Sequence, residues 1–238
     1  MFKKLEIINP ERHGELKFTK VAGYAVAAKT AVAPLGGSEI AEAAKYYPIL
    51  FPVVAEGAKN EDAPLPVALF STKSDENPFV AADGTWADAY IPAHIRRYPF
   101  IFAAHAEAGK FALALDVEAP HFKGDAGEPL FDEDKKATAV VEQAKTFLGN
   151  FQNDLMATTA LVKELDKYGV LVAQQLNLAA GEKKRALAGF RLVDMKKVNE
   201  LDDATLALWV RNGIMGIIYA HLNSISNLKR IVAIQDLD

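Results

Sequence analysis

The sequence predicts an α+β protein, with an antiparallel sheet in its N-terminal half and one long amphipathic helix, a hairpin and C-terminal helices packed against that sheet. Before about residue 130, short apolar runs alternate with Pro, Gly and Asp, which is typical of strands joined by turns. After it, apolar residues recur at spacings of three and four, the period of a helix. The sheet is expected to be open or partly closed like a barrel. Residues 1–238 are expected to form a single domain, because no stretch has the composition of a flexible linker.

Five apolar runs of the N-terminal half are expected to be strands, at residues 21–28, 48–54, 65–71, 100–106 and 111–117. The last two flank Glu107-Ala108-Gly109-Lys110, which suits a hairpin loop. Residues 38–47 are expected to form a short helix that Ser38 caps and Pro48 ends. Asp83-Gly84 marks a turn.

One long amphipathic helix is expected from about residue 134 to residue 168. Its apolar stripe comprises Val140, Ala144, Phe147, Phe151, Leu155, Thr158, Val162 and Leu165. The acidic residues 132–134 are expected to cap its start, and Gly169 to end it. A hairpin of residues 170–178 and 185–193 should follow. Two helices should then complete the chain, one capped by Asp202-Asp203 that reaches Gly213 and one at residues 214–232.

Composition excludes several classes of function. The formal net charge is −4 and no basic stripe is present, so a nucleic-acid partner is not expected. The chain has no cysteine, which excludes thiolate zinc sites, iron–sulfur clusters and cysteine nucleophiles. No apolar run is long enough to span a bilayer, and no apolar signal region follows the lysines at positions 3 and 4. A cytoplasmic location is therefore expected.

The most distinctive stretch, residues 90–102, places Arg96 and Arg97 among proline, aromatic and aliphatic residues. It combines a path fixed by proline with two charges that need partners. A guanidinium group suits bidentate binding of a carboxylate or phosphate, so the two arginines are candidate ligand-binding residues. Tyr98, Tyr90 and Trp86 are candidates for the apolar wall of the same site.

A structural role for the arginines is the alternative. Buried arginines are normally paired with an acid. Under this alternative, one of the two pairs with an internal acid such as Asp116 or Asp132, and the other is exposed.

A metal site is a second hypothesis. His105 and Glu107 alternate along an expected strand, so both side chains would face one metal, and His94 or His121 would complete a triad for ferrous iron. Glu107, however, falls in the expected hairpin loop, and such short patterns arise by chance. We therefore assign no metal ligand, and the sequence identifies no cofactor.

His221 and Ser224 lie three residues apart on the last predicted helix and so share a face. A catalytic Ser–His pair would also need an orienting acid and an oxyanion hole, and the sequence has no nucleophile elbow. His221 is therefore expected to be a hydrogen-bonded core residue. It is also kept among the candidate ligand-binding residues, and no residue is assigned a catalytic role.

A set of short motifs in a fixed order resembles the SapC family, bacterial proteins named after a surface-layer gene region. The motifs are Tyr47-Pro48-Ile49-Leu50-Phe51, Asn77-Pro78-Phe79, Gly84-Thr85-Trp86, Tyr90-Ile91-Pro92, Arg96-Arg97-Tyr98-Pro99-Phe100, Leu113-Ala114-Leu115-Asp116, Pro129-Leu130-Phe131-Asp132, Gly189-Phe190 and Tyr219-Ala220-His221-Leu222-Asn223-Ser224. The chain departs from the family pattern at Asp134-Lys135, where the family tends to have Asp-Gly-Glu after the phenylalanine. The resemblance implies a compact protein and no particular reaction.

Two classes of function follow. The favoured one is a non-catalytic binding or accessory protein that recognises an anionic small molecule or a protein partner through Arg96 and Arg97. The alternative is a metal-dependent, non-haem iron oxygenase with His and acid ligands. The first is preferred because the chain offers no nucleophile–base pair and no convincing ligand triad. The identity of the ligand and the oligomeric state, including a homo-oligomer, are left open.

Overall fold

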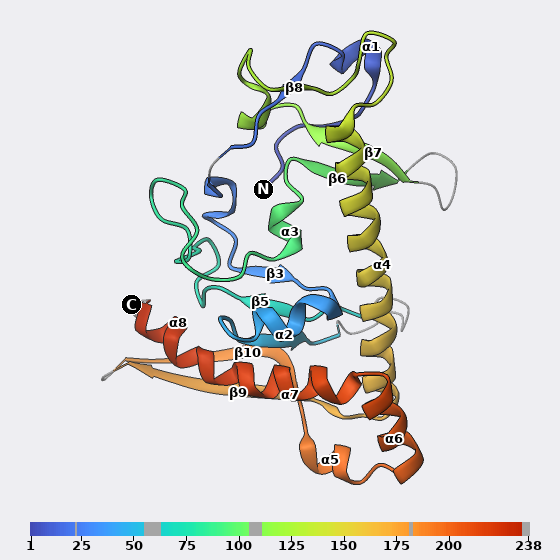
Figure 1. Cartoon of the computed structure of the whole chain (residues 1–238). Coiled ribbons are helices and arrows are strands. Elements are labelled where there is room, and N and C mark those ends of the chain that lie inside the picture. Colours follow the sequence, from blue (N-terminus) through green and yellow to red (C-terminus); the bar gives the residue numbers. More distant parts are fainter. Residues whose placement is uncertain (22, 55–62, 105–110, 181–182, 235–238) are drawn as a thin grey trace.

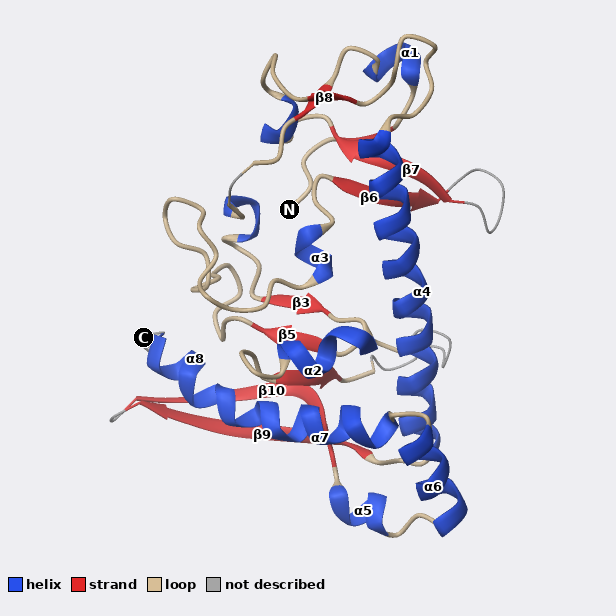
Figure 2. Ribbon diagram, in the orientation of Figure 1, coloured by secondary structure: helices blue, strands red, loops and turns tan. Residues whose placement is uncertain are grey.

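The computed structural model describes residues 1–21, 23–54, 63–104, 111–180 and 183–234 (Figure 1). It confirms the predicted α+β class. The described strands pair in antiparallel fashion into open sheets rather than a closed barrel, and one long helix runs beside them (Figure 2).

The largest sheet has the strand order β3-β5-β4-β10-β9. Its strands are β3 (Val32–Pro34), β4 (Ile49–Pro52), β5 (Val67–Leu69), β9 (Leu171–Ala180) and β10 (Lys183–Val193). The predicted hairpin is thus present as β9 and β10. It does not pack on the N-terminal sheet but extends it, because Phe190 and Arg191 of β10 pair with Pro52 and Phe51 of β4.

Two smaller sheets lie at the other end of the molecule (Figure 1). One contains β1 (Leu5–Ile7), β7 (Phe111–Asp116) and β6 (Phe100–Ala104), and the other pairs β2 (Lys17–Phe18) with β8 (Glu128–Pro129). The predicted strands at residues 100–106 and 111–117 therefore pair as expected, and the loop predicted between them lies outside the described residues. Short helical turns accompany these sheets at α1 (Pro10–His13) and at Pro120–Phe122.

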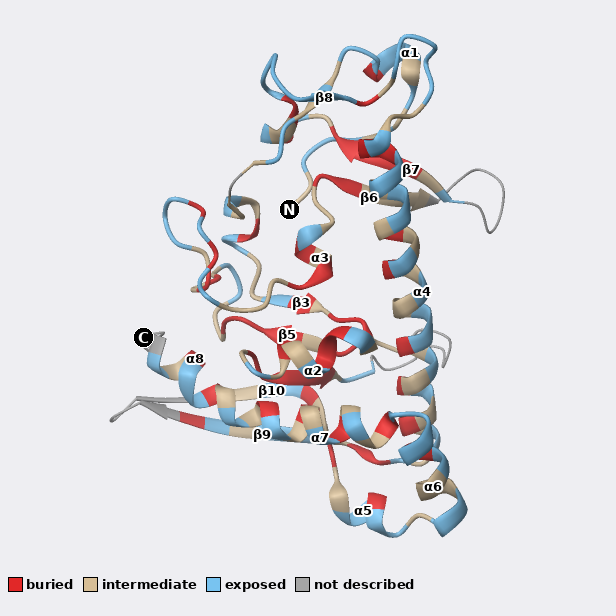
Figure 3. Ribbon diagram, viewed as in Figure 1, coloured by how far each residue is buried: buried red, intermediate tan, exposed pale blue. Residues whose placement is uncertain are grey.

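Helix α4 (Ala139–Lys167) runs from the small sheets at one end of the molecule to the C-terminal helices at the other (Figure 1). No position of the predicted stripe is exposed, and buried positions recur along the helix in Figure 3. Val140 and Leu148 join the core beside β6 and β7, while Val162 and Leu165 join the core beside β10, α6 and α7. The helix thereby connects two hydrophobic cores.

The predicted start of this helix is wrong by five residues, because α4 begins at Ala139 rather than near residue 134. Residues 132–134 belong instead to a tight turn that Phe131 and Ala137 close as a β-bridge. Within it Lys135 has a φ of 61°, a left-handed conformation that a helix does not contain. The predicted stop is confirmed, because Gly169 has a φ of 63° just beyond the last turn.

Two N-terminal predictions are also corrected. Residues 21–28 form no strand in their described part: Gly23 has a φ of 109°, and Ala25–Ala27 form a 3-10 turn. The helix predicted at residues 38–47 is a 3-10 turn (Gly37–Glu39) followed by the short α2 (Ile40–Ala43). Ser38 does not cap it, because its hydroxyl donates to Asp154 Oδ2 of α4 at 2.6 Å.

Four described helices follow the large sheet in the chain, and the last two of them pack against its strands. The four are α5 (Met195–Asn199), which the sequence did not predict, α6 (Asp203–Arg211), α7 (Ile214–Ser224) and α8 (Leu228–Ile234). Asp202 caps α6 as predicted, because its carboxylate accepts from the Thr205 N–H at 2.9 Å. The last predicted helix is divided by a 3-10 turn at Ile225–Asn227. Within the described ranges, no helix has both the length and the apolar character needed to cross a membrane.

We expect Phe151→Ala to lower the free energy of unfolding by about 3–5 kcal/mol, as truncation of a core phenylalanine does. Phe151 is 7% exposed on the inner face of α4. Urea denaturation measures the change. Met156→Ala is the matched control, because Met156 lies on the same helix but is 63% exposed, and less than about 1 kcal/mol is expected there. Equal effects of the two substitutions would mean that the stripe was assigned to the wrong face.

Candidate functional site

The arginine segment folds as one helical turn followed by a strand. Helix α3 (Ala93–Arg96) begins immediately after Pro92, and β6 begins at Phe100 immediately after Pro99. A proline before the first turn suits a helix start because its missing N–H would have no intrahelical acceptor there. Arg96 and Arg97 therefore leave the end of a short helix whose path both flanking prolines restrict.

A buried carboxylate, Glu39, holds this helix in place. Its side chain is 6% exposed. Oε1 accepts from the Ala93 N–H at 2.6 Å and from the Tyr90 hydroxyl at 2.7 Å, and Oε2 accepts from the Gly36 N–H at 3.2 Å. Burial, followed by the hydrogen bond to Glu39, raises the pKa of Tyr90 to about 12, so this hydroxyl stays protonated and keeps donating.

Arg96 is partly paired. Its Nη2 lies 3.7 Å from Glu39 Oε1, and its side chain is 41% exposed. Its Nε donates to the Ile91 carbonyl at 2.8 Å and its Nη2 to the Tyr90 hydroxyl at 3.1 Å. The guanidinium also lies over the ring of Phe147, with 5.5 Å between its central carbon and the ring centre. The structural alternative expected an internal acid beside one of the arginines, such as Asp116 or Asp132, and the internal acid beside Arg96 is Glu39.

Arg97 has no acid partner in the described part of the chain. Its Nε is buried without a hydrogen-bond acceptor, and burial lowers the pKa of its guanidinium. The central carbon of this group lies 5.6 Å from the ring centre of Phe2 and 5.6 Å from that of Phe151. Aromatic faces offset part of the cost of removing a cation from water, but they satisfy none of its N–H donors.

Asp116 anchors the far side of the arginine segment. It is fully buried and accepts from the Lys3 N–H at 2.9 Å, the Lys4 N–H at 3.0 Å and the Tyr98 hydroxyl at 3.2 Å. Burial and the adjacent Asp116 carboxylate together raise the pKa of Tyr98. The two arginines are thus bracketed by two buried carboxylates that bind the residues on either side of them.

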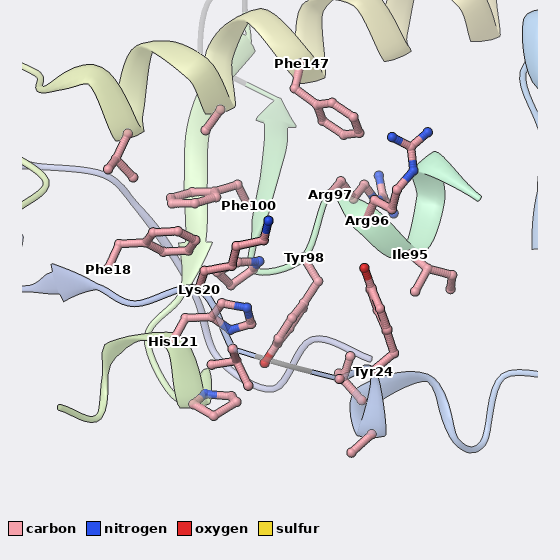
Figure 4. Close-up of a pocket in the computed structure, with 18 of the residues that line it drawn as sticks. Phe18, Lys20, Tyr24, Ile95, Arg96, Arg97, Tyr98, Phe100, His121 and Phe147 are labelled. Carbon is pink, nitrogen blue, oxygen red and sulfur yellow. The ribbon is translucent and has the colours of Figure 1, made fainter. Parts of the chain in front are cut away.

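Arg96, Arg97 and Tyr98 line a cavity of about 710 Å³ between the two ends of the molecule, beside α4 (Figure 4). Its apolar wall includes Phe18, Ile95, Phe100, Val140, Phe147 and Leu148, and its polar lining includes Lys20, Tyr24, Asp83, His121, Glu128 and Gln143. In Figure 4 the hydroxyl of Tyr24 points toward the arginines. A concave, mostly apolar space with a few polar anchors is the usual form of a small-molecule site.

Of the three aromatic candidates for the wall, Tyr98 lines this cavity, whereas Tyr90 and Trp86 contact residues of the lining without belonging to it. Tyr90 holds Arg96 through its hydroxyl. Trp86 is 8% exposed, donates from Nε1 to the Tyr47 hydroxyl at 3.1 Å, and packs edge-on against Tyr24, which does line the cavity. The sequence indicated the aromatic character of the wall, whereas the phenylalanines from β2, β6 and α4 that form it are distant in sequence.

His221 lies in the core and does not line this cavity, so its ligand-binding role stays a prediction. Its Nδ1 lies 2.8 Å from the Ile49 carbonyl of β4, and its Nε2 lies 3.2 Å from the Val193 N–H of β10. Nδ1 is therefore the donor and Nε2 the acceptor, which is the neutral form. Ser224 does not contact the imidazole: its hydroxyl donates to the His221 carbonyl and accepts from the Ile49 N–H.

The described residues contain no group of three His, Cys, Asp or Glu side chains that could hold a metal ion. His105 and Glu107 lie outside the described residues. Of the other two proposed ligands, His121 lines the cavity, and burial, then the charge of Arg97, lowers the pKa of His94 to about 4.

A family model described as SapC matches residues 8–231. The chain belongs to the SapC family. The matched region contains the arginine segment, Glu39, Asp116 and every residue that lines the cavity. No curated protein and no solved structure matches the chain. Membership of the SapC family thus identifies the relatives of this chain but indicates no ligand for the cavity.

We expect Glu39→Gln to lower the free energy of unfolding by about 3 kcal/mol, because a buried ionic network would lose its anion and one acceptor would become a donor. Urea denaturation measures the effect. Glu42→Gln, on the neighbouring turn with a side chain that is 46% exposed, is the control, with less than about 1 kcal/mol expected. If Glu39→Gln were as mild as this control, the arginine segment would not depend on Glu39.

Stability should also fall on acidification below pH 6.5. Burial lowers the pKa of His221 from 6.5 to about 4. Between these values the unfolded chain binds a proton that the folded chain does not, so protons favour unfolding. The full difference corresponds to about 3 kcal/mol.

His94, whose pKa burial also lowers to about 4, adds to this loss in the same direction. Urea denaturation of wild type and His94→Gln from pH 7 to pH 4 measures it. The variant should lose stability less steeply than wild type, and parallel curves would contradict the assignment for His94.

Proposed function

We propose that this member of the SapC family is a non-catalytic binding or accessory protein that recognises an anionic small molecule through Arg96 and Arg97. The cavity beside these residues favours a small molecule over a protein partner, because its walls curve around a volume of about 710 Å³. A nucleic-acid partner is not proposed, since the net charge of −4 offers no general attraction to phosphate backbones.

The observation that carries the proposal is the state of Arg97. Arg97 lines the cavity, and its guanidinium is partly removed from water and meets two aromatic rings rather than a carboxylate in the described part of the chain. Buried cations are normally paired with an acid. An anion that enters the cavity would supply the missing partner at a place where water screens the attraction weakly.

Two further observations support binding rather than catalysis. The hydroxyl of Ser224 contacts backbone atoms and not the ring of His221, so these residues do not form a nucleophile–base pair. Glu39 and Asp116 hold the residues around the arginines through several hydrogen bonds each, so the wall is formed before a ligand arrives. A preformed wall reduces the ordering cost of binding.

The non-haem iron alternative is not proposed, because no observation within the described ranges favours it. A cytoplasmic location, the single domain over residues 1–238 and the oligomeric state stay predictions.

We expect an anionic compound to co-purify with the wild-type protein and to be lost from Arg97→Lys. Lysine keeps the positive charge but cannot reproduce the bidentate fork. The loss of one charge-assisted hydrogen bond, worth about 1.5–3 kcal/mol, weakens binding roughly 10- to 100-fold. Mass spectrometry of the small molecules released from the denatured protein measures retention.

Arg230→Lys is the matched control, because Arg230 also lies over an aromatic ring, that of Phe79, but does not line the cavity. It should retain the compound. If wild type and both variants released the same compounds, and Arg97→Lys markedly lowered the melting temperature, Arg97 would be a structural cation and the binding proposal would fail.

A further inference from the structure

Two cations of the cavity lining, Arg96 and Arg97, lie together on one side of it. Figure 4 shows Arg96 and Arg97 beside Phe147, while Phe18, Phe100 and His121 lie at the other side together with Lys20. The Glu39 carboxylate, 3.7 Å from Arg96, offsets one of the two arginine charges. One positive charge, that of Arg97, is left without a counter-charge among these three side chains.

The opposite side is mainly aromatic, and the lysine on it, Lys20, is exposed to solvent. The ring centres of Phe18 and Phe100 are 5.7 Å apart, and the His121 imidazole stacks on Phe18 at 5.5 Å with an angle of 16° between the rings. Nδ1 of His121 is buried without a hydrogen-bond partner, and burial lowers the pKa of the ring, which favours the neutral form. The acids of the lining, Asp83 and Glu128, are exposed and would repel a second negative charge placed near them.

Resting on the proposed function, we propose that the ligand is an amphipathic monoanion, with one carboxylate or sulfonate at Arg97 and an aromatic body against Phe18 and Phe100. A single negative charge matches Arg97, the partly buried cation of the lining that has no carboxylate beside it in the described chain, whereas Lys20 is exposed and hydrated. Flat rings gain offset-stacked or edge-on contacts with an aromatic wall beyond the burial of apolar area. The cavity of about 710 Å³ also exceeds what an inorganic anion fills.

Two fluorescent probes with one skeleton test this class. Anilinonaphthalene sulfonate carries one negative charge on an aromatic body, and N-phenylnaphthylamine has the same rings without the sulfonate. Titration of the full chain should show the sulfonate binding at least about tenfold more tightly, as expected for one added ion pair. Inorganic phosphate, as a small anion without an apolar body, is the third probe and should not displace the sulfonate.

Variants separate the two halves of the site. Arg97→Gln should weaken the sulfonate about tenfold and leave the neutral probe within about twofold. Phe18→Leu, which keeps an apolar side chain but removes the ring, should weaken both probes. Arg230→Gln and Phe111→Leu should change neither, because Arg230 and the 54% exposed Phe111 lie outside the lining. Circular dichroism of each variant confirms that it is folded.

The outcomes distinguish this inference from the function on which it rests. Equal binding of both aromatic probes, unchanged by Arg97→Gln, would overturn the monoanion. If phosphate raised the melting temperature of wild type but not of Arg97→Gln, while neither aromatic probe bound, the anion site would stand and the amphipathic ligand would be wrong. If no probe bound in a manner that depends on Arg97, both proposals would fail.

Discussion

The carboxylate of Glu39 is the interaction on which the geometry of the cavity depends. It joins the turn after β3, through the Gly36 N–H, to the start of α3, through the Ala93 N–H, and to Tyr90 and Arg96. A carboxylate that is 6% exposed is costly unless hydrogen bonds replace its water. Three hydrogen-bond donors and the neighbouring guanidinium of Arg96 provide that replacement. Loss of any one of these groups would leave the negative charge of Glu39 poorly satisfied.

Helix α4 fixes the turn that carries Glu39. Asp154 accepts from the N–H and the hydroxyl of Ser38, and the Gly37 N–H donates to the Thr158 hydroxyl at 2.6 Å. The approach is so close that a Cβ atom on Gly36 would lie 1.9 Å from Asp154 Oδ2, which explains the glycine at that position. The same helix contributes Phe147 and Phe151, whose rings lie beside Arg96 and Arg97. One helix therefore positions both the support and the aromatic neighbours of the arginines.

Long elements with a regular apolar repeat were predictable from the sequence, and elements held by polar contacts between distant residues were not. The stripe from Val140 to Leu165 predicted α4, because about seven turns of regularly spaced apolar residues outweigh one glycine. Residues 21–28 were expected to be a strand from their apolar content, but short side chains and Gly23 leave little to pack, and the chain turns there. The acids at 132–134 resembled a helix cap, yet the bridge between Phe131 and Ala137 closes a turn first.

The candidate site shows the same division. Its arginines were conspicuous in sequence because two charges stand among large apolar residues. Glu39 was not, because an acid in the first turn of a short helix is ordinary, and only the fold brings it to Arg96. His221 was conspicuous in sequence because it lies three residues before Ser224. In the structure it instead hydrogen-bonds to backbone groups of β4 and β10, and so joins α7 to the C-terminal hairpin and to the N-terminal sheet.

The arrangement also explains why the two adjacent arginines differ. Arg96 follows Ala93 by one helical turn, so its guanidinium lies near the Glu39 carboxylate that accepts from the Ala93 N–H. This carboxylate offsets part of the positive charge of Arg96. Arg97 leaves the helix in another direction and meets Phe2 and Phe151, which accept its charge but none of its hydrogen bonds. Tyr98, the next residue, is held by Asp116. The segment thus has fixed neighbours on both sides and, between them, one guanidinium whose buried Nε–H lacks an acceptor in the described chain. Because this wall is held in place on both sides, we propose that an anion entering the cavity supplies the partner that Arg97 lacks.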